Sequence, residues 1–159
     1  MKKNYNKKIT SFIKIAEANK LIGFLIMNSV ENTRYMQLDY FAILPEYQNK
    51  GYGTKAIKEL KKVVPNYDAI FVEIEKLGCG ANKEENKIRE KRAKFYERLD
   101  FHKLNANFKW FNSLFLSVYY LKVSENQTYD EKEILNNIFE IYYKVHSKKK
   151  VDENCEIIK

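Results

Sequence analysis

The hydrophobic pattern of the chain first changes from the period of a strand to the period of a helix between Pro45 and Thr54. Before Pro45, apolar residues alternate with polar ones or form short apolar runs, which is typical of strands. After Thr54, apolar residues recur at the spacing of one helix face: Ala56, Ile57, Leu60, Val63 and Val64. Pro65 is expected to end that helix. The chain therefore passes from a strand into a helix through a short segment that contains two glycines.

Other segments follow the same two periods. Residues 13–27 predict a strand hairpin, and residues 35–44 predict a third strand that stops at Pro45. Residues 69–74 predict a strand, and Asn82 is expected to cap a second helix together with Glu85. On that helix Ile88, Phe95 and Leu99 form one apolar stripe. Residues 101–110 and 114–123 predict a closing hairpin, residues 130–146 a last helix, and residues 147–159 a disordered tail.

This order predicts an α/β fold of the α+β type, with a mixed, mainly antiparallel sheet, one parallel crossover and helices on both faces. At 159 residues with 45% hydrophobic content, we expect a single domain over residues 1–159 with its core at about 11–123. No stretch approaches the ~20 apolar residues of a membrane span, and no signal-peptide core follows Met1. We therefore expect a cytoplasmic protein without membrane contact.

Cysteines and histidines are few and lie far apart. Cys79 and Cys155 suggest no disulfide framework, and His102 and His146 show no metal-ligand spacing, so no metal site is expected. The net charge of +8 suits either nucleic acid or a phosphate-rich cofactor. Because the lysines are spread along the whole chain, most of this charge is interpreted as solvated surface.

Gly51 and Gly53 lie between the end of a predicted strand and the start of a helix. Without a Cβ, their backbone N–H groups can surround an anion, and the helix adds about half a positive charge at this end. Lys50 and Lys55 add further charge. The segment therefore predicts a cradle for the pyrophosphate of a cofactor.

Two other interpretations of these glycines remain. They also suit an ordinary turn, and Gly51-x-Gly53-x-x-Ala56 fits a relaxed dinucleotide-binding fingerprint with Glu73 as its acidic residue. However, the glycines follow antiparallel strands instead of opening a βαβ unit, which disfavours dinucleotide binding. No Walker A sequence occurs.

The segment Gln48-x-x-Gly51-x-Gly53 resembles the phosphate-binding signature of the GNAT N-acetyltransferase superfamily. Residues 38–45 look like the strand along which that family places the pantetheine arm, and residues 92–101 are similar to its later helix and turn. The paired Glu73 and Glu75 resemble an uncharacterised bacterial subgroup of the family. The resemblance implies acetyl-CoA as co-substrate, bound by Phe41, Ala42, Ile43, Gln48, Asn49, Lys50, Gly51, Tyr52, Gly53 and Thr54.

The resemblance further implies that a primary amine attacks the acetyl thioester directly. An amine with a pKa of about 10.4 needs a base, and the candidates are Asp39, Glu73 and Glu75, with Glu73 ranked first. Tyr96 is the candidate acid or hydrogen-bond donor for the leaving thiolate. Each carboxylate also suits a solvated strand position, and Tyr96 also suits the apolar stripe of its helix. In the family, a backbone N–H near residues 41–43 polarises the thioester.

The chain departs from the family in two places. Asp100 stands where glycine is usual, although Asp tolerates the left-handed conformation. The family's first strand and first helices are expected to be truncated, so the last helix or a second copy would cover the acceptor side. The acceptor is expected to be a small-molecule or peptide amine, and the closing strands offer an edge for a homodimer. A non-catalytic acyl-CoA-binding module, or a basic nucleic-acid-binding domain, is the alternative.

Overall fold

The computed structural model describes residues 9–31, 33–125 and 129–158. In chain order their elements are β1 (Ile9–Glu17), β2 (Lys20–Ser29), β3 (Tyr35–Ile43), the 3₁₀ turn η1 (Pro45–Tyr47), α1 (Tyr52–Val63), β4 (Ala69–Glu75), α2 (Lys83–Glu97), β5 (Phe101–Trp110), β6 (Leu114–Lys122), α3 (Glu131–His146), α4 (Lys148–Asn154) and β7 (Cys155–Ile158). These bounds agree with the predicted strands and helices up to His146. The mixed, mainly antiparallel sheet with helices on both faces is confirmed.

The strands form one sheet in the order β1-β2-β3-β4-β6-β5-β7. Only the β3–β4 pair is parallel among the described strands, as expected from a strand–helix–strand crossover through α1. The parallel register begins with Tyr35 opposite Ala69 and ends with Leu38 opposite Val72. Beyond these residues β3 and β4 are no longer paired, although each strand continues.

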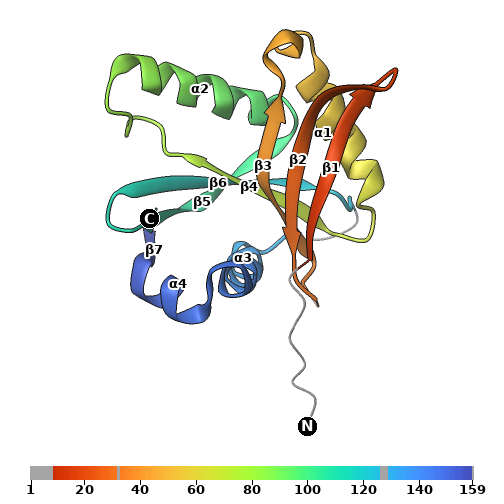
Figure 1. The fold of residues 1–159 in the computed structure, drawn as a ribbon. Coiled ribbons are helices and arrows are strands. Elements are labelled where there is room, and N and C mark those ends of the chain that lie inside the picture. Colours follow the sequence, from red (N-terminus) through yellow and green to blue (C-terminus); the bar gives the residue numbers. More distant parts are fainter. Residues whose placement is uncertain (1–8, 32, 126–128, 159) are drawn as a thin grey trace.

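Helices lie on both faces of the sheet (Figure 1), and a hydrophobic core lies on each face. On one face α1 and α2 pack through Ile57, Leu60 and Tyr96 against alternate strand residues such as Val72. On the other face α3 packs through Ile138 and Tyr142, together with Val151 of α4. Because side chains of a strand alternate between faces, β4 directs Ile70, Val72 and Ile74 to the α1–α2 core and Phe71 to the α3 core.

Local signals placed the helix ends correctly. Asn82 accepts a hydrogen bond from the Glu85 amide (2.9 Å), and the Glu85 carboxylate accepts one from the Ala81 amide (2.8 Å). Asp100 has a φ of 63°, so it takes the left-handed conformation at the turn from α2 to β5. No helix among the described residues is both long enough and apolar enough to cross a membrane.

Three expectations differ from the structure. Residues 148–158 are not a disordered tail, because α4 places Val151 in the α3 core and β7 pairs with β5. The edge expected at the closing strands is also shortened: β6 lies between β4 and β5, and β7 pairs with residues 107–110 of β5, which leaves residues 101–106 as its unpaired side. Val63 and Ile88 were expected on apolar helix faces but are 63% and 49% exposed. Val63 is the last residue of α1 and Ile88 is the first of its predicted stripe on α2, so each lies near one end of the apolar stripe.

Candidate active site

A short loop joins the end of β3 to the start of α1. Asn49 and Gly51 both have positive φ, at 59° and 81°. Gly51 is the N-cap of α1, and no side chain caps this helix end. The first amides of α1, at Tyr52, Gly53 and Thr54, are therefore free of helical partners and carry the positive end of the helix dipole. This is the geometry expected of an anion cradle.

Two polar side chains hold the loop in place. Gln48 donates from Nε2 to the carbonyl oxygen of Ile43 (2.9 Å), and Lys50 donates from Nζ to the carbonyl oxygen of Glu46 (2.7 Å). Lys50 also lies over the Tyr47 ring. The first bond links the loop to the end of β3 and the second links it to η1, so these side chains shape the cradle from within.

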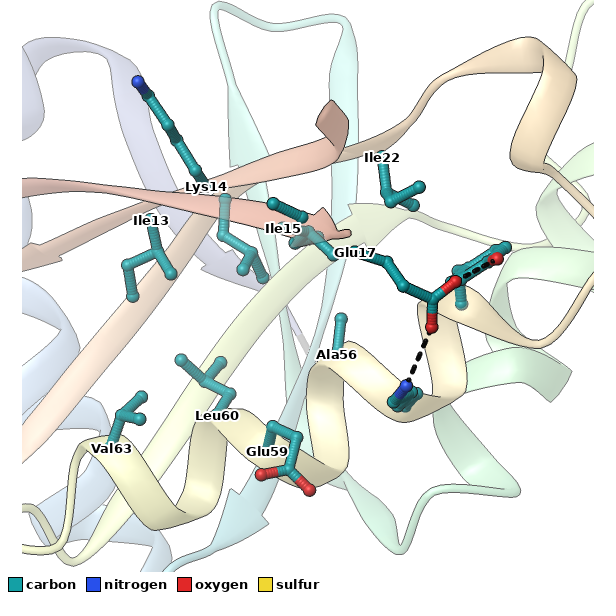
Figure 2. A pocket seen from close by; sticks show the side chains of 13 residues that line it. Ile13, Lys14, Ile15, Glu17, Ile22, Ala56, Glu59, Leu60 and Val63 are labelled. Atoms are coloured by element: carbon teal, nitrogen blue, oxygen red, sulfur yellow. Dashed lines mark hydrogen bonds and ion pairs between the residues drawn. The ribbon is translucent and has the colours of Figure 1, made fainter. Parts of the chain in front are cut away.

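A hollow of about 260 Å³ lies between the β1–β2 hairpin and α1 (Figure 2). Its walls are mainly apolar, formed by residues such as Ile13, Ile15 and Leu60. At one end, Glu17 accepts hydrogen bonds from the Tyr52 hydroxyl (2.7 Å) and from Lys55 Nζ (3.2 Å), which are dashed in Figure 2. Lys55, expected to add charge to the cradle, is therefore directed toward β1.

A larger cavity, of about 800 Å³, lies between the cradle, the end of β3 and α2. Its wall contains these predicted cofactor-binding residues: Phe41, Ile43, Gln48, Asn49, Gly51, Tyr52, Gly53 and Thr54. Ala42 and Lys50 do not line it. Ala42 alternates with Phe41 and faces the other side of the sheet, and the Lys50 side chain bonds to the Glu46 carbonyl oxygen instead. Four basic side chains do line it: Lys58, Lys91, Arg92 and Arg98. The cavity therefore joins free helix amides to positive charge, which suits a ligand with several phosphates.

Gly53 lies where the cavity is narrow. A Cβ at this position would come within 3.4 Å of the Phe95 ring and 3.5 Å of the Phe41 ring. The two rings themselves are 6.2 Å apart between centroids. A Cβ at residue 53 would therefore make ordinary van der Waals contact with both rings and occupy part of the space between the cradle and the end of β3.

The cavity is lined by Phe41 and Ile43, on the part of β3 that lies beyond its last pair with β4. Asp39 bulges from β3 there, because Leu38 pairs with Met27 of β2 and Tyr40 pairs with Ile26. After the bulge Phe41 faces α2, so its neighbour Tyr40 faces the α3 side. The unpaired end of β3 therefore presents backbone groups to the gap and side chains to both faces of the sheet.

Glu73 lies on β4 just past the last paired residue, Val72, and its carboxylate faces α3. Gln37 donates from Nε2 to one carboxylate oxygen (2.6 Å), and the Tyr142 hydroxyl donates to the other. Burial raises the pKa of Glu73, the two hydrogen bonds lower it, and the charge of Asp39 raises it, which leaves it at about 7. A carboxylate with this pKa exchanges a proton readily near neutrality.

The other two candidate bases have different surroundings. Glu75 forms an ion pair with Arg92. Burial raises the pKa of Glu75, but hydrogen bonds from its own backbone and from Arg92, with the charges of Arg92 and Arg89, outweigh burial and place it below its ordinary value. Asp39 is exposed. Of the three, Glu73 alone combines burial with a pKa near neutrality.

Tyr96 packs into the α1–α2 core and also lines the large cavity. Its ring lies edge-on to Phe95 and Phe101, with centroids 5.2 and 5.0 Å apart. Burial raises the pKa of Tyr96 to about 12. Because of this high pKa the hydroxyl is protonated at neutral pH. No hydrogen bond from another described residue occupies it, so it is able to donate to a ligand.

Sequence reasoning missed several residues of this region. Gln37 and Tyr142 contact Glu73 from β3 and α3, and the basic wall of the cavity comes from α1 and α2. Gln37 had one weak signal, since it is a polar residue inside a mainly apolar strand. Tyr142 had none, because its helix stripe suits packing alone and its contact spans 69 residues of sequence.

Comparisons with known proteins identify the family and the fold. The model of the acetyltransferase (GNAT) family matches residues 2–101. A comparison with curated proteins found no match. Among solved structures, a GNAT-family protein from Bacteroides thetaiotaomicron is 17% identical, with a TM-score of 0.66 over 86% of this chain and 72% of that one.

Two further structures resemble this fold. A GNAT family acetyltransferase from Elizabethkingia anophelis, solved with acetyl-CoA bound, is 11% identical, with a TM-score of 0.57 over 71% of this chain and 76% of that one. The ribosomal-protein-S18-alanine N-acetyltransferase of Escherichia coli is 16% identical, with a TM-score of 0.53 over 76% and 75% of the two chains. At these identities the likeness concerns the fold. Because the family model spans more than half of the 159 residues, the chain belongs to the GNAT acetyltransferase family.

Proposed function

We propose that the protein is an N-acetyltransferase that moves an acetyl group from acetyl-CoA to a primary amine by direct attack. The observation that carries this proposal is the cavity of about 800 Å³ at the start of α1. It combines the uncapped helix end with four basic side chains and continues to the unpaired end of β3. The pyrophosphate of coenzyme A suits the cradle, and the pantetheine arm suits the passage along Phe41.

In this proposal the reacting atoms meet where β3 and β4 separate, beyond the last pair between Leu38 and Val72. The amine nitrogen bonds to the thioester carbonyl carbon, the carbon–sulfur bond breaks, and coenzyme A leaves as a thiolate. The neutral amine attacks, and Glu73 takes the proton that the nitrogen loses once it is bonded to the carbonyl carbon; its pKa of about 7 suits a general base at neutral pH. Unpaired N–H groups of β3 are suitably placed to polarise the carbonyl.

Tyr96 acts on the leaving sulfur as a hydrogen-bond donor instead of a full acid. A thiol has a pKa of about 8.5, whereas burial raises that of Tyr96 to about 12. Complete proton transfer from Tyr96 to the thiolate would therefore be uphill by roughly 5 kcal/mol at about 1.4 kcal/mol for each pH unit. A hydrogen bond stabilises the developing thiolate without that cost.

The acceptor side is the α3 face of the sheet, opposite the cavity. Asp39 and Glu73 supply negative charge there, and Tyr40, which is 53% exposed, stacks on Phe24 with ring centroids 5.5 Å apart. Carboxylates and an exposed aromatic face both attract ammonium groups. These contacts favour a cationic amine, either a small molecule or a peptide.

The first test is thermal unfolding of the protein with and without acetyl-CoA, with NAD as the control ligand. A ligand that binds the native state raises the midpoint by mass action. We expect a shift with acetyl-CoA alone, followed by release of free thiol when a panel of cationic amines is added. A shift without thiol release supports a non-catalytic acyl-CoA-binding module, and no shift removes the basis of the proposal.

A matched pair of variants tests the location of the site. Lys91 lines the cavity, whereas Lys94, three residues later on α2, is exposed and does not. Lys91→Gln is expected to reduce the shift caused by acetyl-CoA, because it removes a charge near the phosphates. Lys94→Gln changes the net charge equally and is expected to keep the shift. Equal effects of the two variants would indicate a general charge effect and contradict the site.

A further inference from the structure

A row of polar side chains crosses the α3 face of the sheet in an otherwise apolar setting. Thr10 of β1 donates to Asn28 of β2 (2.9 Å), and Asn28 donates to Gln37 of β3 (3.1 Å). Gln37 in turn donates to Glu73 of β4 (2.6 Å). Asn28 and Gln37 are 1% and 4% exposed. Because an unpaired buried amide is costly, these bonds hold the Gln37 amide in one orientation, with its N–H toward Glu73.

The other oxygen of Glu73 receives its hydrogen bond from α3. The Tyr142 hydroxyl donates to it, and this hydroxyl also accepts a bond from the Trp110 side chain of β5. Tyr142 is 1% exposed, and its ring packs against Phe108 and Trp110 with centroids 5.5 and 5.2 Å apart. The hydroxyl therefore has one fixed position, set by the packing of α3 against β5.

We propose that Tyr142 and Gln37 are positioning residues that hold the Glu73 carboxylate, one on each oxygen, in the orientation that accepts the proton of the amine. This inference rests on the proposed function and extends it to α3, the C-terminal helix. A carboxylate has about four acceptor positions, and the two donors fix the plane of the group while leaving positions free. Rotation of the Glu73 carboxylate would break both bonds.

Several titratable groups surround this carboxylate. Asp39 faces it from β3 and Tyr142 faces it from α3. Cys155 of β7 is also close, since burial and the charge of Glu73 raise its pKa to about 12. His146, one turn beyond Tyr142, lies against the Trp110 and Tyr142 rings, with centroids 5.3 and 6.4 Å apart. Near neutral pH Tyr142 and Cys155 stay protonated, so neither contributes to a titration near pH 7.

The test is a carbon-detected NMR titration of the Glu73 side-chain carboxyl group in the ligand-free protein, with the signal assigned by its loss in Glu73→Gln. Tyr142→Phe removes one hydroxyl and keeps the ring that packs against Trp110. Because this bond stabilises the charged carboxylate, its loss is expected to raise the Glu73 midpoint by about one pH unit. Tyr143→Phe, on the same helix, is the control and is expected to leave the midpoint unchanged.

Gln37→Met gives an independent measurement from the other oxygen and is expected to shift the midpoint in the same direction. It also serves if Tyr142→Phe does not fold. Wild-type midpoints in both Tyr142→Phe and Gln37→Met would overturn the proposal, whether or not the protein transfers acetyl groups.

Kinetics then test the catalytic consequence. With any amine that is acetylated, the acidic limb of the kcat/KM profile is expected to move upward with the NMR midpoint in Tyr142→Phe, while the KM for acetyl-CoA stays near that of the wild type. A moved midpoint with an unmoved limb would show that Glu73 does not accept the proton. A moved midpoint in a protein without any transfer activity would instead contradict the proposed function and leave the hydrogen bonds themselves established.

Discussion

Glu73 gives the strongest physical prediction, because its ionisation opposes folding. Its pKa of about 7 in the fold, against an ordinary value of 4.5, makes the ionised form about 3 kcal/mol less favourable in the folded protein than in the unfolded chain, at about 1.4 kcal/mol for each pH unit. Because the pKa is raised in the folded protein, the protonated Glu73 carboxyl group favours the fold. Its contribution to the free energy of unfolding is complete below pH 4.5, decreases as the pH rises, and is lost once the pH passes about 7.

Glu73→Gln removes the ionisation but keeps the size of the side chain. We expect the unfolding free energy of Glu73→Gln, relative to wild type, to rise by roughly 3 kcal/mol between about pH 4.5 and pH 8. A pH-independent offset of about 1 kcal/mol from an altered hydrogen bond leaves this change unaffected. The measurement is urea unfolding of both proteins at a series of pH values, analysed by linear extrapolation.

Glu75→Gln is the matched control, because Glu75 lies two residues along the same strand and its pKa is shifted in the opposite direction. A lowered pKa contributes stability above the ordinary pKa that is lost on acidification. The loss of stability in Glu75→Gln is therefore expected to be larger at pH 8 than at pH 4.5. If the difference between Glu73→Gln and wild type stays constant over this range, Glu73 is not a buried carboxyl group with a raised pKa, and its assignment as the base loses its support.

Two other substitutions test the remaining parts of the site. Tyr96→Phe is expected to lower kcat roughly tenfold or more, through loss of a donor to the leaving sulfur, while the acetyl-CoA-dependent shift in unfolding temperature stays the same; an unchanged kcat would contradict the role of Tyr96. Gly23→Ala is expected to destabilise the protein by at least about 2 kcal/mol in urea unfolding. Its Cβ would lie 2.2 Å from the backbone carbonyl oxygen of Ala42 on β3, the strand that borders the cavity. Near wild-type stability would show that β2 and β3 do not approach so closely.

The elements of the fold could be predicted because their signals are local. The change from period 2 to period 3.6 around Pro45 and Thr54 located β3 and α1 to within two residues at either end. The capping of α2 by Asn82 and the left-handed Asp100 also depend only on neighbouring residues. Residues 148–158 escaped prediction because their order comes from contacts with β5 and α3, and their own composition is polar.

The sequence by itself determined the cradle. Gln48, Gly51 and Gly53 lie within six residues of each other, so the conformation of the loop and the start of α1 follow from short-range geometry. The properties of Glu73 were decided only by the tertiary structure. Its neighbours Gln37, Asp39 and Tyr142 come from β3 and α3, and its pKa depends on how deeply the packing of α3 buries it. Burial and long-range hydrogen bonds act across the sheet, and no pattern along the chain records them.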